Sequence, residues 1–167
     1  LAPLYAAFQA TREAPISLAR PVAAPLDLSP RISPPLFLED LKQRSFRFFW
    51  ETTDARTGLA PDRWPARSFA SIAAVGFALT AYPIGVARGW ITREQARERA
   101  LATLRFFHDA PQGPEATGTA GHKGFFYHFL DMASGTRFGD CELSTIDTAL
   151  LLAGALHVQS FFDGADA

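Results

Sequence analysis

Acidic residues gather where the last apolar helix of the chain is expected to begin. The stretch GDCELSTIDTALLLAG, residues 139 to 154, carries Asp140, Glu142 and Asp147 and then no further charge. Ser144 and Asp147 fit the N-cap and N3 positions of a capping box. Glu142 lies two residues before that cap, where the helix dipole and free backbone N–H groups favour an ionised carboxylate. The alternative interpretation of Glu142 is an acid in a surface loop.

A second acidic residue follows an aromatic run. Asp131 ends the segment FFYHFLD, an environment that would raise the pKa of its carboxyl if the group is desolvated there. Glycoside hydrolysis needs one protonated carboxyl to donate to the leaving oxygen and one ionised carboxylate to act as base or nucleophile. We therefore assign Glu142 to the base side and Asp131 to the acid side. The alternative for Asp131 is an aspartate that starts a turn.

Aromatic residues in the connecting segments indicate a sugar ligand. Trp64, Phe126 and Tyr127 fall in Gly- and Pro-rich connections, where a flat ring could stack on a sugar. Packing in the core or within a loop is the alternative for each ring. His122 and His128 have a spacing that is weak as a metal site, so we expect no metal and assign His128 to structural hydrogen bonds or to the sugar.

Composition bounds the class of protein. The chain has 167 residues, 48% of them hydrophobic, which suits one globular domain with a real core. Its 16 basic and 17 acidic residues give a net charge of −1 with no basic run, so a nucleic-acid partner is not expected. Cys141 has no second cysteine to pair with. The glycines of GTAG lack a preceding strand, which disfavours a phosphate site, and we expect no cofactor.

The chain divides by its pattern into two parts. Residues 1–35 hold seven of the prolines with almost no helical period and are predicted to form an extended leader or linker. Residues 36–167 form the predicted domain. Within it, residues 68–87 are uncharged over about the length of a membrane span, but their small and polar residues favour a helix buried in protein, so we predict no membrane span.

Four segments of the predicted domain have helical patterns of two alternating kinds. The first and third have one apolar face, and the second and fourth are apolar on nearly every side. Alternation of outer and inner helices is typical of an α/α toroid, with about two helix pairs here. Phe125 to Asp131 is predicted to be a short strand in a hairpin that turns at ASG. The four helices are expected over residues 36–53, 68–89, 92–109 and 144–161.

Three segments together resemble a known family. SIAAVGFALTAYPIGVARGWITREQA, GFFYHFLDMASGTRF and ELSTIDTALLLAGAL, in this order, are similar to the bacterial glucoamylase-like family. That family includes the endo-β-1,2-glucanases and the related domain of cyclic β-1,2-glucan synthases. The resemblance runs from about Phe37 to the C-terminus and leaves residues 1–35 outside it.

The resemblance implies a fold, a location and a set of site residues. It implies part of an (α/α)6 toroid with a sugar cleft at one end, no metal, and export to the periplasm. It also implies that Asp131, Glu142 and Asp147 face the cleft. We expect Arg137 to contact substrate as well. Members of the family are much longer, so the chain is expected to be an N-terminal portion that needs the C-terminal half of the toroid.

Three functions follow from these expectations. The first is a glycoside hydrolase that acts on β-glucan, with β-1,2 linkages preferred. The second is a transglycosylating domain of a cyclic glucan synthase. The third is a carbohydrate-binding or structural helical module without turnover.

Overall fold

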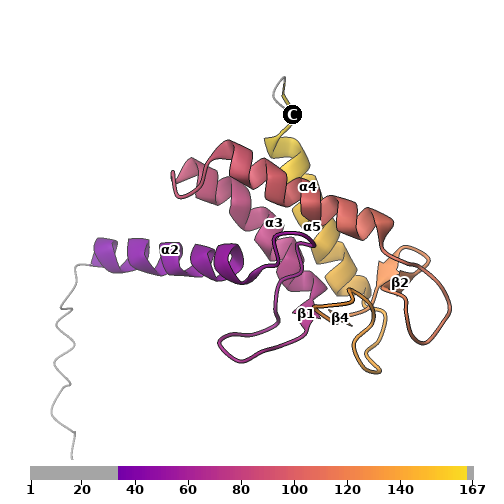
Figure 1. The fold of residues 1–167 in the computed structure, drawn as a ribbon. Coiled ribbons are helices and arrows are strands. Elements are labelled where there is room, and N and C mark those ends of the chain that lie inside the picture. Colours follow the sequence, from indigo (N-terminus) through magenta and orange to yellow (C-terminus); the bar gives the residue numbers. More distant parts are fainter. Residues whose placement is uncertain (1–33, 165–167) are drawn as a thin grey trace, which may run out of the picture. The chain divides into compact units, whose positions relative to one another are not determined.

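The structure, a computed structural model, describes residues 34–164, and four helices dominate it (Figure 1). The predicted leader therefore lies almost wholly outside the described residues. Each helix begins and ends within four residues of its expected bounds: α2 (Pro34–Thr52), α3 (Ile72–Ala87), α4 (Arg93–Asp109) and α5 (Thr145–Phe161). Among the described residues, no helix has both the length and the apolar character that crossing a membrane would require.

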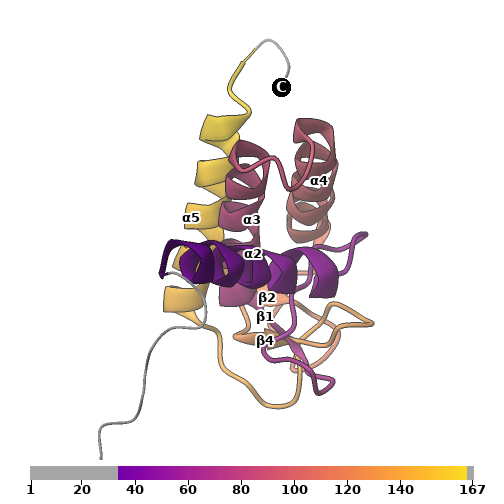
Figure 2. The same ribbon diagram turned by 90° about the vertical axis from the view of Figure 1, so that its left-hand side faces the viewer.

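The helix α3 is the centre of the packing. It lies between α5 and α4, with α2 crossing in front (Figure 2). Ile72, Val75, Leu79 and Tyr82 on α3 have no exposed surface, as expected for an inner helix. The helix continues through Pro83, which is itself buried, to Ala87.

Two glycines let α3 and α5 approach closely. Both helices begin at the end of the molecule where the strands lie (Figure 1). A side chain at Gly76 would collide with the backbone of Leu150, and one at Gly154 would collide with the backbone of Gly76. The absence of a Cβ at both positions therefore permits backbone contact between the helices.

The described residues leave part of the apolar surface of α5 uncovered. The helix is apolar on nearly every side, as predicted for an inner helix, and its buried residues are Thr148, Leu151, Gly154 and Val158. Other large apolar side chains of this helix face outward, and they are Ile146, Leu152 and Leu156, with exposed fractions of 72%, 54% and 65%. The described residues thus cover α5 on one side only, and on α3 they leave Phe77 and Ile84 exposed.

The predicted strand is split into two shorter ones. The run Phe125 to Asp131 is not one strand: β3 (Phe125–Phe126) pairs with β2 (Gly121–His122), and β4 (Phe129–Leu130) pairs with β1 (Ala70–Ser71), both antiparallel. The hairpin β2–β3 turns at Lys123 and Gly124, whose φ angles of 52° and 83° are left-handed. The ASG segment makes the turn of a hairpin, as predicted: Leu130 pairs antiparallel with Arg137, and the N–H of Gly135 donates to the carbonyl of Asp131 at 2.8 Å.

Candidate active site

His128 lies between two carboxylates. Its Nδ1 is 2.8 Å from Oε1 of Glu142, and its Nε2 is 3.0 Å from Oδ2 of Asp147. We call these three residues the His128 cluster. The sequence pattern placed all three among the candidate residues, and the structure adds that they are in direct contact.

Backbone pairing brings the cluster together where α3 and α5 begin. The N–H of His128 donates to the carbonyl of Glu142 at 2.9 Å, and the carbonyl of His128 accepts from the N–H of Ile72, the first residue of α3, at 3.3 Å. The N–H of Ser144 donates to the carbonyl of Phe126 at 3.0 Å. The segment that carries His128 is thus held between the starts of both helices.

The capping box predicted at α5 is only half formed. The N–H of Asp147 donates to the Ser144 hydroxyl at 3.1 Å, as an N3 residue should. The return bond from the Asp147 carboxylate to the Ser144 N–H is missing, because that N–H already donates to Phe126. The carboxylate of Asp147 binds His128 instead. By contrast, the box predicted at α4 is complete, with Thr92 and Gln95 exchanging both bonds.

The hydrogen bonds of the cluster favour an anionic Glu142. Each ring nitrogen of His128 lies within hydrogen-bond distance of a carboxylate oxygen, and an imidazole donates from both nitrogens only when both carry a proton. The hydrogen bond from the backbone N–H of Glu142 to its own carboxylate, together with the one from His128, holds the pKa of that carboxyl below its usual value. Glu142 is therefore an anion at neutral pH, as predicted for the base side.

Exposure distinguishes the two carboxylates. The side chain of Glu142 is 68% exposed, whereas that of Asp147 is 13% exposed. The ring of His128 is further fixed by stacking on Phe129, with centroids 3.9 Å apart and planes 19° apart. Asp147 and Phe129 therefore orient the imidazole from the protein side, and Glu142 presents its carboxylate to solvent and to any ligand there.

The predicted environment of Asp131 is wrong. Its Oδ1 accepts from the N–H groups of Ala133 and Ser134, at 3.0 and 2.8 Å, and from the Ser134 hydroxyl at 3.0 Å. These bonds, the one from the Ser134 N–H first, hold the pKa of Asp131 below its usual value. The aspartate starts a turn, which was the alternative interpretation, and the argument for a protonated acid at this position is lost.

Two of the three aromatic candidates lie in the interior. Phe126 and Tyr127 are 8% and 7% exposed, and Phe126 packs edge-on against Phe107 with centroids 5.0 Å apart. The expectation that these rings stack on a sugar is therefore wrong. The two rings are buried because β3, which carries Phe126, packs on α5 and residues 126 and 127 pair with the segment that leads into that helix, although the flanking sequence has the composition of a loop.

Of the remaining two candidates, Arg137 is engaged by the protein itself and Trp64 is exposed. The guanidinium of Arg137 lies 4.6 Å from the ring centre of Tyr127, and its Nε donates to the carbonyl of Cys141 at 2.7 Å, so it ties loops together. Trp64 is 66% exposed and lines a hollow of about 520 Å³ beside Phe48 and Arg47 of α2. Trp64 alone of the three aromatic candidates has a ring that a sugar can reach.

The described part of the chain contains no set of metal ligands. Between residues 34 and 164, no group of three or more His, Cys, Asp and Glu side chains is arranged to hold a metal ion. The His128 cluster instead pairs each carboxylate with a ring nitrogen.

Comparisons with known proteins give the chain its relatives. No model of a known protein family matches it. It is 29% identical over 132 residues to an exo β-1,2-glucooligosaccharide sophorohydrolase of Parabacteroides distasonis, a match that covers 75% of this chain and 17% of that protein. The chain thus spans less than a fifth of the length of this curated relative.

Solved structures with the same fold point to the same group. A β-1,2-glucanase from Parabacteroides distasonis matches with a TM-score of 0.68 and 26% identity, over 80% of this chain and 19% of that one. A candidate glucoamylase from Bacteroides uniformis matches with a TM-score of 0.69 and 25% identity, over 82% and 33% of the two chains. The chain is therefore similar in sequence and fold to part of the glucoamylase-like proteins that include β-1,2-glucanases, which confirms the predicted resemblance and the predicted class, part of an (α/α)6 toroid.

Proposed function

We propose that the full-length protein is a glycoside hydrolase that cleaves β-glucan, with β-1,2 linkages as its substrate. The proposal is supported by the names of the sophorohydrolase and of the β-1,2-glucanase that the chain resembles. It is also supported by the position of the His128 cluster, at the end where both inner helices begin.

The observation that carries the proposal is the exposed, ionised carboxylate of Glu142. Cleavage of a glycosidic bond needs an anionic carboxylate that can reach either the sugar or a water molecule beside it. Glu142 meets both requirements, since its side chain is exposed and its pKa is lowered. We assign it to the base or nucleophile role.

His128 and Asp147 support that carboxylate. His128 orients Glu142 by a hydrogen bond at 2.8 Å, and Asp147 orients His128 from the less exposed side at 3.0 Å. In this proposal His128 and Asp147 act as positioning residues. That either of them also contacts the sugar remains a prediction from the sequence.

The acid of the reaction is not assigned to Asp131. A general acid must hold its proton at working pH, and the pKa of Asp131 is lowered by the hydrogen bonds of its turn. The assignment made from the sequence has therefore lost its physical basis.

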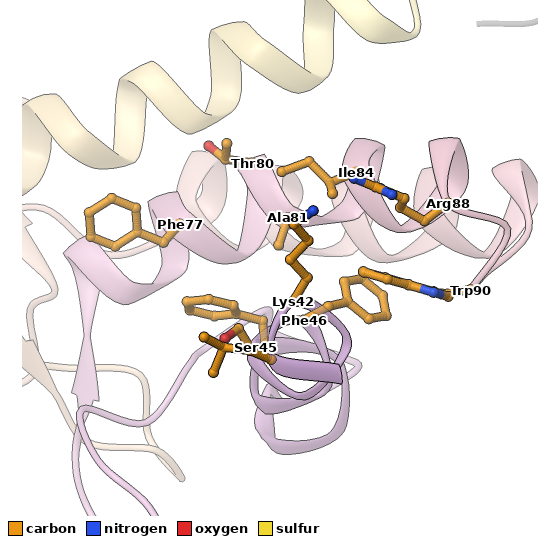
Figure 3. Close-up of a pocket in the computed structure, with 11 residues that line it drawn as sticks. Lys42, Ser45, Phe46, Phe77, Thr80, Ala81, Ile84, Arg88 and Trp90 are labelled. Atoms are coloured by element: carbon orange, nitrogen blue, oxygen red, sulfur yellow. The ribbon is translucent and has the colours of Figure 1, made fainter. Parts of the chain in front are cut away.

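A partner surface belongs to the same proposal. The exposed apolar residues of α5 and the hollow of about 520 Å³ between α2 and α3 leave apolar surface uncovered by the described residues. Figure 3 shows Phe46 of α2 and Phe77 and Ile84 of α3 on opposite sides of that hollow, together with Trp90. We propose that further helices of a toroid cover these surfaces. Dye binding or self-association by the isolated chain is expected, and a monomer that binds no dye would contradict this.

Export to the periplasm remains a proposal that rests on the family resemblance. Fractionation of cells that express the full-length protein tests it, with activity expected in the periplasmic fraction.

The function is tested by the substrate. Release of reducing sugar from soluble β-1,2-glucan should exceed release from laminarin or starch, and it should depend on Glu142. Glu98 on α4 is exposed and lies outside the cluster, so Glu98→Gln is the matched control. Products larger than the substrate or cyclic would favour the transglycosylating alternative. No release from any of the three glucans by the full-length protein would overturn the proposal.

A further inference from the structure

An aromatic stack leads away from the His128 cluster. The ring of Phe129 stacks on His128, the ring of Phe69 lies 4.3 Å from that of Phe129, and the ring of Phe138 lies 4.8 Å from that of Phe69. Phe138 is 42% exposed and ends the stack. Sequence analysis did not select Phe69 or Phe138, although each follows an arginine by one or two residues in a connecting segment.

The stack borders a pocket between two connecting segments. The pocket has a volume of about 430 Å³, within the ~300–1,000 Å³ of small-molecule sites. One wall comes from the segment before β1, with Arg63, Arg67 and Phe69, and the other from the turn after β4, with Asp131 and Phe138. We call it the Phe138 pocket. It shares Phe69 and Phe138 with the stack that begins at His128.

The polar groups of the pocket suit hydroxyl groups. The three hydrogen bonds of Asp131 within its turn all use Oδ1, which leaves Oδ2 to accept from a ligand. Arg63 and Arg67 add guanidinium donors, with Arg63 lying 5.7 Å from the centre of the Phe69 ring. A carboxylate beside guanidinium groups and an aromatic face offers both an acceptor and donors to vicinal hydroxyls.

Charge favours a neutral ligand over an anion. Asp131 lines the pocket, and Asp62 lies 3.0 Å from Arg63, so carboxylates accompany the two arginines. A phosphate or sulfate group would meet the Asp131 carboxylate as well as the guanidinium groups, at a cost from like charge. A sugar ring carries no charge and has an apolar face that can lie on an aromatic ring.

We propose that the Phe138 pocket is a binding subsite for a glucosyl unit of the substrate, separate from the unit that is cleaved. The inference rests on the proposed function, since it takes a glucan as the ligand. Phe138 provides the stacking face, Asp131 accepts from hydroxyl groups, and Arg67 donates to them. Asp131 is thus a substrate-binding residue. The aromatic stack of His128, Phe129, Phe69 and Phe138 joins this subsite to the His128 cluster, and the proposal requires one oligosaccharide to extend from one to the other.

The test measures binding against the length of the ligand. β-1,2-Glucooligosaccharides of two to six glucose units are titrated into the full-length protein by calorimetry, in a Glu142→Gln background that keeps the ligand intact. Phe138→Ala is expected to weaken binding of the longer oligosaccharides about tenfold, the scale of one aromatic contact, and to change the disaccharide less. Arg67→Ala is expected to weaken the longer ligands about threefold, the scale of one solvent-exposed polar contact.

Matched variants separate stacking from folding. Phe125 is 44% exposed on β3, outside the pocket, and Phe125→Ala is expected to bind all lengths as the parent does. Phe138→Tyr keeps the aromatic face and should restore affinity. Arg67 is exposed, so Arg67→Ala still tests the subsite if Phe138→Ala fails to fold.

The outcomes distinguish the two proposals. If Phe138→Ala and Arg67→Ala bind the long oligosaccharides as tightly as the parent protein does, the subsite is overturned and the glycosidase proposal still stands. A parent that binds none of the oligosaccharides and releases no sugar from β-1,2-glucan would overturn both. Weaker binding of long ligands by Phe138→Ala and Arg67→Ala, with Phe125→Ala unchanged, supports the subsite.

Discussion

The run from Phe125 to Asp131 and the segment from Glu142 to Asp147 both contained predicted site residues, but their residues have different roles in the structure. The first run contributes buried aromatic rings and a turn aspartate, with His128 as its one member in the cluster. The second contributes both carboxylates that bind His128. The difference arises from which backbone N–H groups near each acid are free to donate a hydrogen bond to it.

The contrast teaches how hydrogen bonds choose between similar acids. Asp131 and Asp147 each follow apolar or small residues and each lies near the start of a local structure. The nearest free donors to Asp131 are the N–H groups of its own turn. Near Asp147 the competing donor is the N–H of Ser144, which donates to the carbonyl of Phe126 instead. The carboxylate of Asp147 is therefore free to bind His128. Similar sequence contexts therefore give one aspartate bound within its own turn and one bound to His128.

The largest expected effect tests the buried part of the aromatic run. Phe126→Ala removes a ring that is 8% exposed, so it should lower the free energy of unfolding by about 3–5 kcal/mol. Trp64→Ala removes a ring that is 66% exposed and should change stability by less than about 0.5 kcal/mol. Chemical denaturation measures both. Equal losses for the two variants would remove the distinction between core and surface rings.

The second effect tests the carboxylate that the cluster presents. Glu142→Gln in the full-length protein should reduce turnover of β-1,2-glucan by at least ~100-fold, the scale for a positioned acid or base, without loss of folding. Asp131→Asn should lower kcat by less than about tenfold, because a carboxyl ionised by its turn is not a proton donor. Steady-state kinetics and circular dichroism measure the pair. A Glu142→Gln enzyme with near-normal turnover would make that carboxylate a structural residue.

The third effect tests His128 as a positioning residue. His128→Gln should cost on the order of tenfold in kcat/KM through misplacement of Glu142. It should also move the acidic limb of the pH profile to higher pH. The hydrogen bond from His128 is one of the causes that lower the pKa of Glu142, so its loss raises that pKa and the base is protonated at a higher pH.

A control separates this role from general stability. His108 is exposed on α4 and pairs with Asp109, and His108→Gln should leave the pH profile unchanged. If His128→Gln lowers activity while the acidic limb stays in place, His128 acts through folding alone.

The smallest effect tests the turn at Asp131. Asp131→Ala removes three hydrogen bonds at a solvated site and should lower the free energy of unfolding by about 1 kcal/mol at pH 7. Because the pKa of Asp131 is lowered from its ordinary value of 3.8, this stabilisation is complete above that pH and is lost as the pH falls through the lowered value.

Thermal melts from pH 7 to pH 2 measure that loss. The difference between wild type and Asp131→Ala should shrink at the acidic end, while Asp140→Ala, at an exposed loop position, should stay within about 0.5 kcal/mol of wild type throughout. A difference that grows toward low pH would contradict the assigned sign.

The sequence by itself determined the helices and the residues of the cluster. Helical periodicity and the capping signals at Thr92 and Ser144 are local, so they identified four helices and placed Glu142 and Asp147 at the mouth of α5. The three segments of the family resemblance predicted the toroid class.

Only the tertiary structure decided which side chains meet. The contact of His128 with Glu142 and Asp147 depends on antiparallel pairing of residues 126–128 with 142–144, which no local signal specifies. The burial of Phe126 and Tyr127 depends on that same pairing, since composition alone placed both rings in a loop. A few backbone hydrogen bonds between residues 126–128 and 142–144 therefore decided which side chains of the aromatic run belong to the site and which are buried in the core.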